Sequence, residues 1–142
     1  MKEYTIREIS ERFGLPASTI RYYEEEEGIL TNVGRTPSGQ RVFTDGHVNR
    51  LRTVCCFKNT GMTINELKQF FAYEADEAAH LDDILALLQQ RKESVTAQIA
   101  QLKEAYAHVL RKIHYYEDIQ KSLNENLPLP QWKDYRQRVY EK

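Results

Sequence analysis

The chain has few cysteines, glycines and prolines, and it has no long apolar run. Its 142 residues include two cysteines, six glycines and four prolines. Cys55 and Cys56 are adjacent, and neighbouring side chains of a helix point about 100° apart, so the two thiols are poorly placed to bridge each other and a disulfide framework is excluded. No apolar run approaches the roughly 20 residues that span a bilayer, and the first residues lack the apolar core of a signal peptide. We therefore expect a cytoplasmic protein with no membrane contact.

The sequence also lacks the residue sets of common enzymes and metal sites. It contains no recognisable Ser-His-Asp set, phosphate loop or carboxylate pair, so we expect no enzymatic activity and no cofactor. The four histidines do not cluster, because His108 and His114 are six residues apart and face different sides of a helix. We therefore expect no metal site.

The net charge of −1 argues at first sight against a nucleic-acid partner, because Lys and Arg side chains must neutralise phosphates. Residues 1–73, however, hold ten Lys and Arg against nine Asp and Glu, and four of these acids form the single run 24–27. Outside that run the balance is ten to five. A solvated surface of mixed charge remains the alternative interpretation.

Residues 5–24 have the outline of a helix-turn-helix. Thr5 and Glu8 are spaced as a capping box, which opens a helix. Gly14 supplies the left-handed exit of that helix, and Pro16 can open the next one because a missing amide hydrogen costs nothing in a first turn. The apolar face of the first helix comprises Ile6, Ile9 and Phe13.

The candidate recognition helix is the segment 18–24, Ser-Thr-Ile-Arg-Tyr-Tyr-Glu. Ile20 is its expected buried residue, and Tyr23 either joins the DNA-binding set or packs beneath the next segment. Arg binds guanine edges or phosphates, and hydroxyl groups bind phosphate oxygens. An amphipathic surface helix is the alternative. The residues expected to face DNA are Ser18, Arg21 and Tyr22.

A small wing should follow the recognition helix. The acidic run 24–27 concentrates like charges at a helix C-terminus, so we expect the helix to end inside it and Gly28 to mark the break. Residues 29–30 are apolar and should turn into the core. The turn signal Pro-Ser-Gly then lies between Arg35 and Arg41, which predicts a hairpin with an arginine on each arm.

Two further helices are expected. Thr44 can cap the first of them, and Gly61 ends it. Thr63 and Glu66 form a second capping box, which opens a helix that continues to about Phe71. The apolar arc of the helix after Thr44 comprises Val48, Leu51, Val54, Cys55 and Phe57.

This ordered series resembles the winged-helix DNA-binding domain of MerR-family bacterial transcription regulators. The resemblance covers residues 4–71 and implies that the protein distorts promoter DNA and has RNA polymerase as a partner. It rests on Tyr4-Thr5-Ile6, Ile20-Arg21-Tyr22-Tyr23-Glu24, the wing 35–43, and Gly61-Met62-Thr63-Ile64. The residues that it places on the operator are Arg21, Tyr22, Arg35, Arg41 and Lys58.

The chain departs from the family pattern at three places. Residues 25–27 stand between Tyr-Tyr-Glu and the following glycine, where the family usually has two residues, and the extra residue could displace the wing. Gln40 stands where an aromatic residue is common. Pro16 replaces the usual Ser or Thr cap, which leaves the recognition helix without a side-chain cap.

A heptad pattern runs through residues 81–123 and predicts a coiled coil. At 1.5 Å per residue this helix would be about 64 Å long, too long to bury its seam on a small domain. We therefore expect a homodimer, and MerR-like regulators are similar in joining two DNA-binding domains by an antiparallel helix pair. An intramolecular hairpin is the alternative, although no turn signal interrupts the pattern. The predicted dimer interface comprises Leu85, Leu88, Val95, Ile99, Leu102, Tyr106, Val109, Ile113 and Tyr116.

The predicted fold is mainly α-helical: a winged helix-turn-helix followed by a long dimerisation helix in an antiparallel coiled coil. The expected parts are a DNA-binding domain at 1–72, a connector at 73–80, the dimerisation helix at 81–123 and a short tail at 124–142. The tail leaves no room for a separate ligand-binding domain, and residues 134–140 could add one or two helical turns. It should pack back onto the dimer; a pocket lined by Trp132 and Tyr135 is the alternative.

Cys56 is the candidate sensor. It lies at the edge of the apolar arc, one turn after Arg52, whose guanidinium would favour the reactive thiolate. Residues 56–61 also resemble a branch of the family that has a cysteine at this place and responds to aldehydes and other electrophiles. The alternative is that both cysteines are small helix hydrophobes.

The sequence thus predicts a dimeric regulator that binds a palindromic promoter operator and distorts it, with modification of Cys56 as the candidate switch. One alternative is a DNA-bending architectural or excision accessory protein on the same fold, without an effector. Another is a coiled-coil interaction protein that does not bind DNA, which the wing arginines and the recognition-helix residues argue against.

Overall fold

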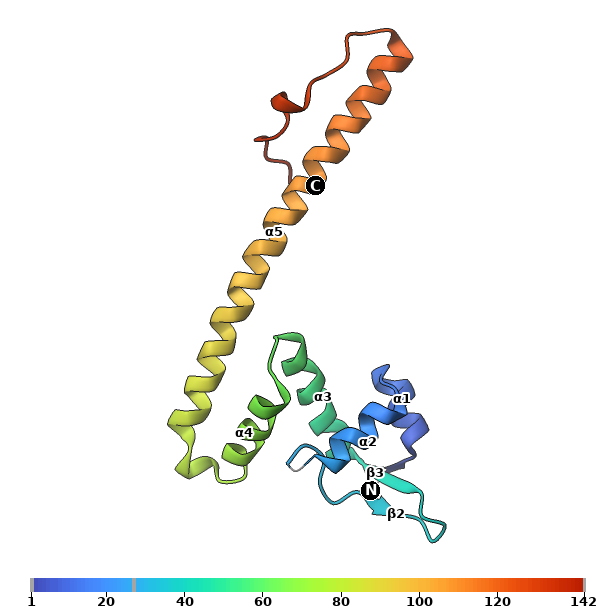
Figure 1. Cartoon of the computed structure of the whole chain (residues 1–142), viewed down its shortest axis with the longest axis vertical. Helices are drawn as coiled ribbons and strands as arrows, with labels where there is room; N and C mark the ends of the chain where they lie inside the picture. The colour runs from blue at the N-terminus through green and yellow to red at the C-terminus, as the bar shows by residue number, and fades with distance from the viewer. Residues whose placement is uncertain (1, 27, 142) are drawn as a thin grey trace. The chain divides into compact units, whose positions relative to one another are not determined.

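The computed structural model describes residues 2–26 and 28–141 and is mainly helical (Figure 1). The chain forms two compact units, the first ending at Lys92 and the second beginning at Glu93. Its helices and strands, in chain order, are β1 (Glu3–Tyr4), α1 (Ile6–Phe13), α2 (Ala17–Glu25), β2 (Gly34–Arg35), β3 (Arg41–Thr44), α3 (Asp45–Asn59), α4 (Ile64–Glu74), the 3₁₀ turn η1 (Glu77–Ala79), α5 (Leu81–Glu125) and the 3₁₀ turn η2 (Trp132–Asp134).

The helix-turn-helix begins as predicted. Thr5 Oγ1 accepts a hydrogen bond from the Glu8 amide (3.1 Å), and Glu8 Oε1 accepts one from the Thr5 amide (3.0 Å), so the capping box of α1 is present. Gly14 ends α1 with φ 65°, in the left-handed region. Pro16 precedes α2, and no side chain caps that helix.

The acidic run ends α2, as its like charges predict. The helix closes at Glu25, and the chain then turns so that Ile29 and Leu30 become buried. A hydrogen bond from the Leu30 amide to the Tyr23 carbonyl (3.1 Å) holds this turn against α2. The extra residue expected in the segment 25–27 involves Glu27, which lies outside the described residues.

The predicted wing is present as a hairpin of β2 and β3. The sheet order is β1-β3-β2, with both pairs antiparallel, and Arg35 lies opposite Arg41. Thr36 closes the hairpin tip, because its amide donates to the Gln40 carbonyl and its own carbonyl accepts from the Gly39 amide, each at 2.8 Å. The wing tip is therefore held by its own backbone.

The second capping box also forms, between Thr63 and Glu66 at the start of α4. Gly61 follows α3 with φ 89°. The helix α4 continues to Glu74, three residues beyond its predicted end at Phe71, because residues 72–74 contain neither glycine nor proline and the helix has no reason to stop before them.

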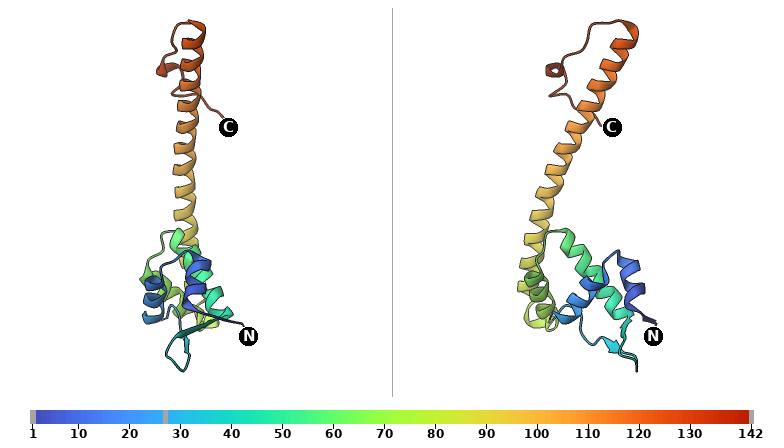
Figure 2. Two further views of the ribbon diagram at one scale, coloured as in Figure 1. Left: turned by 90° about the vertical axis from the view of Figure 1, so that its right-hand side faces the viewer. Right: turned by 45° about the vertical axis from the view of Figure 1, so that its right-hand side comes forward.

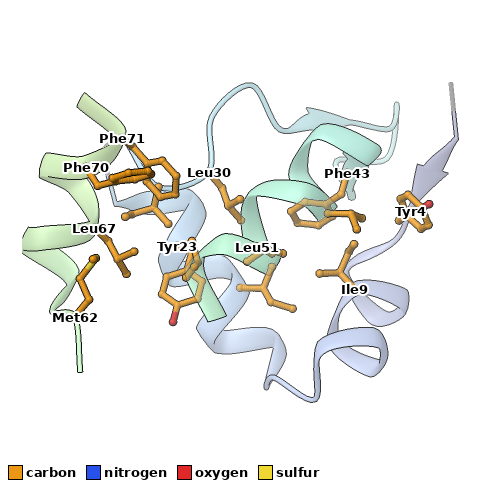
Figure 3. Close-up of a cluster of buried hydrophobic side chains, with 14 residues drawn as sticks. Tyr4, Ile9, Tyr23, Leu30, Phe43, Leu51, Met62, Leu67, Phe70 and Phe71 are labelled. Carbon is orange, nitrogen blue, oxygen red and sulfur yellow. The ribbon is translucent and has the colours of Figure 1, made fainter. Parts of the chain in front are cut away.

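The core of the first unit is arranged along α3 (Figure 3). Leu51 of α3 is fully buried between two groups of side chains. The predicted arc of α3 is largely confirmed, with Val48, Leu51 and Val54 buried and Phe57 partly buried. The group at one end of α3 comprises Tyr4, Ile9 and Phe43, and the group at the other end comprises Met62, Leu67, Phe70 and Phe71.

The first three turns of α5 belong to the first unit. Ile84, Leu87 and Leu88 are partly buried against its core. The heptad pattern did not predict this packing, because it identifies the seam of a coiled coil and not a second apolar face. Leu88 was expected only in the dimer interface, which stays a prediction, and the structure shows it partly buried against its own unit.

In the second unit the tail returns alongside α5 (Figure 2). Asn126, with φ 56°, reverses the chain after α5, and the Leu127 amide donates to the Ser122 carbonyl (2.8 Å). The prediction of helical turns at 134–140 is wrong, because the tail has only the 3₁₀ turn η2 at Trp132–Asp134 followed by irregular turns. Contacts with α5 hold the tail in this irregular conformation.

Candidate DNA-binding surface

The exposed face of α2 carries the side chains that the sequence predicted for it. Ser18, Arg21 and Tyr22 are exposed, and Ile20 is fully buried. Tyr23 is buried in the core, and this burial raises the pKa of its phenol. Its prediction as a DNA-binding residue is therefore corrected, and the alternative, that it packs beneath the following segment, is what the structure shows.

Both wing arginines bind the same carboxylate at the end of α2. Arg35 Nη2 lies 2.6 Å from Glu24 Oε1, and Arg41 Nε lies 2.5 Å from Glu24 Oε2. Burial of Glu24 opposes its ionisation, but the hydrogen bonds from Arg41 and Arg35 outweigh that effect and lower its pKa. The wing is thus tied to the recognition helix by one shared anion.

The acidic run binds cations from two directions. Besides Glu24, Glu26 pairs with Lys68 of α4 at 3.2 Å, and Glu25 lies 4.0 Å from Arg41. The sequence had suggested only repulsion within this run. The structure shows instead that the wing and α4 supply the compensating charge, and Lys68 was missed because it lies 42 residues from its partner.

Arg50 of α3 is a second residue that sequence reasoning missed. Its Nε donates to the Ile29 carbonyl and its Nη2 to the Gly28 carbonyl, each at 2.6 Å, and its guanidinium lies 3.8 Å from the centre of the Phe71 ring. Burial lowers the pKa of Arg50, and the nearby charge of Glu74 offsets part of this lowering. Arg50 therefore joins the loop after α2 to α4.

The root of the wing is fixed by His47 and Asp45. His47 Nδ1 accepts from the Thr44 amide (3.0 Å), so Nε2 carries the hydrogen and donates to the Thr31 carbonyl (2.6 Å). Asp45 Oδ1 accepts from the Tyr4 hydroxyl (2.7 Å). The two His47 bonds connect both ends of the wing to α3, and the Asp45 bond connects β1 to it.

The sequence matches two family models. The model described as "MerR HTH family regulatory protein" matches residues 4–74, and the model described as "MerR, DNA binding" matches residues 48–112. An HTH-type transcriptional regulator of Haemophilus influenzae, described as uncharacterized, is 34% identical over 114 residues, which are 80% of this chain and 84% of the relative. The chain belongs to the MerR family.

Two solved structures extend the similarity of this MerR-family regulator. One is the crystal structure of HiNmlR, "a MerR family regulator lacking the sensor domain, bound to promoter DNA"; it has a TM-score of 0.77 and 33% identity, with 91% of this chain and 98% of that chain covered. Another is a putative MerR family transcriptional regulator from Listeria monocytogenes, with a TM-score of 0.71, 26% identity and coverage of 87% and 92%. They confirm the predicted fold, a winged helix-turn-helix followed by a long helix.

The cysteines of this MerR-family chain lie on α3, where Lys58 is also exposed. Cys55 is half-buried, and its burial, with Cys56 beside it, raises the pKa of its thiol. Cys56 is exposed, but in the described part of the chain Arg52 donates to Asn49 Oδ1 (3.2 Å) and not to Cys56. This bond does not test the expected effect of Arg52 on Cys56, which stays a prediction, as does the Cys56 switch.

The predicted dimer seam lies largely open on α5. Seven of its nine residues are exposed, while Leu88 and Val95 are half-buried. No helix in the described ranges is both long and apolar enough to cross a membrane. The exposed seam residues are Leu85, Ile99, Leu102, Tyr106, Val109, Ile113 and Tyr116.

The tail covers another face of α5. The Tyr135 hydroxyl donates to Asp118 Oδ2 (2.5 Å), which raises the pKa of Tyr135 to about 12, and Arg111 Nε donates to the Arg138 carbonyl (2.7 Å). Trp132 packs edge-on against Tyr115. Tyr135 is buried by these contacts, so the tail packs onto α5 of its own chain.

The histidines take part in ring contacts. His108 lies edge-on to Trp132, and His114 stacks on Tyr140 with ring centres 3.7 Å apart. Across residues 2–26 and 28–141, no group of three His, Cys, Asp or Glu side chains is placed to hold a metal ion.

Proposed function

We propose that two copies of this chain pair through antiparallel α5 helices and that the dimer binds a palindromic promoter operator. Each α2 would enter one half-site, and distortion of the DNA between them would let RNA polymerase engage. The observation that carries this proposal is the similarity, over 91% of the chain, to a regulator that is described as bound to promoter DNA. The dyad of such a dimer matches the symmetry of a palindromic site.

The chemistry of the exposed surface supports the proposal. Arg21 on α2 has five donors in a planar fork and suits a guanine edge or two phosphates, while the hydroxyls of Ser18 and Tyr22 suit phosphate oxygens. Arg35 and Arg41 on the wing would add phosphate contacts, as would Lys58 at the end of α3. Contacts of this kind release counterions, so binding should weaken steeply with salt.

The open seam supports pairing of two copies. Seven exposed apolar side chains on one helix form a stripe that burial against an equivalent stripe would remove from water. An antiparallel partner offers the same residues in reverse order, which satisfies two-fold symmetry with one surface.

The test is binding of the purified full chain to a palindrome from its own upstream region and to a scrambled duplex of equal length, at several salt concentrations. We expect Arg21→Ala to weaken palindrome binding by roughly 1–3 kcal/mol and to reduce discrimination between the two duplexes. Lys103→Ala is the matched control, since it removes an exposed cation from α5, outside the proposed surface. Equal affinity for both duplexes would contradict the proposal and favour an architectural DNA-binding protein.

The same assay tests the predicted switch at Cys56. Promoter output is measured with and without a reactive aldehyde for the wild type and for Cys56→Ser. A response lost in Cys56→Ser would support the switch, and an equal response in both proteins would contradict it.

A further inference from the structure

The wing places two like charges opposite each other. Arg35 of β2 and Arg41 of β3 are direct partners in the antiparallel register. Like charges directly opposite on a strand pair are destabilising. The hairpin tolerates this pair because the carboxylate of Glu24 takes one arginine on each oxygen.

The three members of this group are unequally exposed. The side chain of Glu24 is 16% exposed and that of Arg41 is 23% exposed, whereas that of Arg35 is 42% exposed. Arg35 therefore keeps part of its guanidinium open to a further ligand while it is held by Glu24. Arg41 is the more enclosed partner and leaves less of its side chain open to a phosphate.

The two strands of the wing are anchored differently. β2 has only two residues, and the loop before it passes through Asn32 with φ 59°. β3 is anchored, because it pairs with β1 and buries Phe43. β2 follows β3 through its ladder pairing, and the bridges from Arg35 and Arg41 to Glu24 then tie this hairpin to α2.

We propose that Glu24 is a positioning residue for DNA binding: it holds the wing and α2 as one rigid reading surface and sets the direction from which Arg35 and Arg41 approach the duplex. This inference rests on the proposed function above. It assigns a role in DNA binding to an acid, which by charge alone would repel phosphates.

The charge effect and the positioning effect of Glu24 predict opposite changes in affinity when its charge is removed. If Glu24 acted only through its charge, neutralising it would free two arginines and tighten binding to every DNA sequence. If Glu24 positions the wing, neutralising it leaves the arginines free to bind phosphates but no longer in register with α2. Specific binding then weakens while non-specific binding does not.

The experiment compares wild type, Glu24→Gln and Glu25→Gln on the palindrome and on the scrambled duplex. Glu25→Gln is the matched control, because it removes the neighbouring charge from a side chain that is 70% exposed and 4.0 Å from Arg41. We expect Glu24→Gln to lower palindrome affinity by about tenfold, with scrambled-DNA affinity equal or higher and a steeper salt dependence. Glu25→Gln should leave palindrome affinity equal or slightly higher.

Three outcomes would overturn the proposal. Palindrome affinity of Glu24→Gln could equal or exceed that of wild type, or Glu25→Gln could show the same loss. Both affinities of Glu24→Gln could also fall in proportion to a lower fraction of folded protein in thermal melting, which would indicate a purely structural role. A wild type that does not discriminate between the duplexes would instead contradict the proposed function, so the two failures are distinguishable.

Discussion

The two compact units of the chain bury their apolar side chains in different ways. The first packs α1 to α4 and the start of α5 around one core, in which residues such as Leu51 and Phe43 are fully buried. In the described part of the second unit, only Leu110 and Tyr135 are buried apolar residues, while Leu102 is 72% exposed. The first unit therefore satisfies its apolar surface within one chain, and the second does not.

The cause is the number of layers. A helix with an apolar stripe is stable when another layer covers the stripe. The first unit supplies that layer from its own helices and hairpin, whereas the second has one helix and a tail that covers a different face. The stability of the first unit should thus depend little on protein concentration. The stability of the second unit should depend on it strongly.

The largest effect should come from placing charge in the open seam. Leu102→Asp combined with Val109→Asp would bury unpaired carboxylates in the proposed dimer, at a cost of several kcal/mol. We expect a monomer in analytical ultracentrifugation and a loss of operator affinity of about 100-fold or more, since one half-site is left per molecule. Ala100→Asp, exposed and off the seam, should remain dimeric. A dimer that survives the double substitution would show that pairing uses another surface.

Cavities in the two units should behave differently. Leu51→Ala removes a fully buried side chain and should lower the free energy of unfolding by about 2–5 kcal/mol, to the same extent at all protein concentrations. Leu102→Ala should have an effect that depends on protein concentration, because its burial needs a second copy. Urea unfolding at two widely separated protein concentrations checks both variants. If Leu102→Ala lowered the free energy of unfolding equally at both protein concentrations, the proposed difference between the two units would be wrong.

The tail offers an intermediate test. Tyr135→Phe removes the hydrogen bond to Asp118 and should weaken tail docking by about 1–2 kcal/mol, which faster tryptic cleavage after Lys133 would report. Tyr140→Phe is the control, because its hydroxyl accepts only a 3.4 Å contact from Arg138. Unchanged cleavage in Tyr135→Phe would mean that the ring contacts alone dock the tail.

The same bond sets a pH limit on docking. The folded pKa of Tyr135 is raised from 10.0 to about 12, so its stabilisation is complete below pH 10 and is lost as the pH rises to about 12. Trp132, the only tryptophan, lies in the tail, and its fluorescence should change over this range in wild type and much less in Tyr135→Phe.

The smallest effect should be the pH dependence of the Glu24 bridge. Its lowered pKa means that the bridge stabilises the fold above the ordinary value of 4.5 and loses this contribution as the pH falls through the lower folded value. The difference in unfolding free energy between wild type and Glu24→Gln should be about 1 kcal/mol or less at neutral pH and should close in acid. Urea titrations over that range measure it, and a difference that persists in strong acid would point to packing and not charge.

Local features of the first unit could be read from the sequence because their partners are close in the chain. The capping pair Thr5 and Glu8 is three residues apart, and Gly14 and the wing turn act through their own backbone. Family resemblance then ordered these elements into a fold. Tyr23 shows the limit of such local prediction. Helical periodicity alone does not decide whether Tyr23 faces DNA or the core, because its burial depends on the segment around Leu30 that folds against α2.

The contacts that fix the candidate site were not predictable in this way. Glu24 meets Arg35 across 11 residues and Glu26 meets Lys68 across 42, and no spacing rule connects such pairs. Arg52 also has an acceptor that the helical wheel did not reveal, because its guanidinium donates to Asn49, three residues earlier. Long-range pairing depends on the packed fold, which charge patterns do not specify.

The start of α2 differs electrically from the starts of α1 and α4. Glu8 and Glu66 place a carboxylate in the first turn of those two helices and cancel the partial positive charge there. α2 begins after Pro16 with no side-chain cap and no acid in its first turn, so about half an elementary charge of its helix dipole stays uncancelled beside Ser18. This positive pole is built from backbone amides. An anion held there would be attracted by a field that no side-chain titration can switch off.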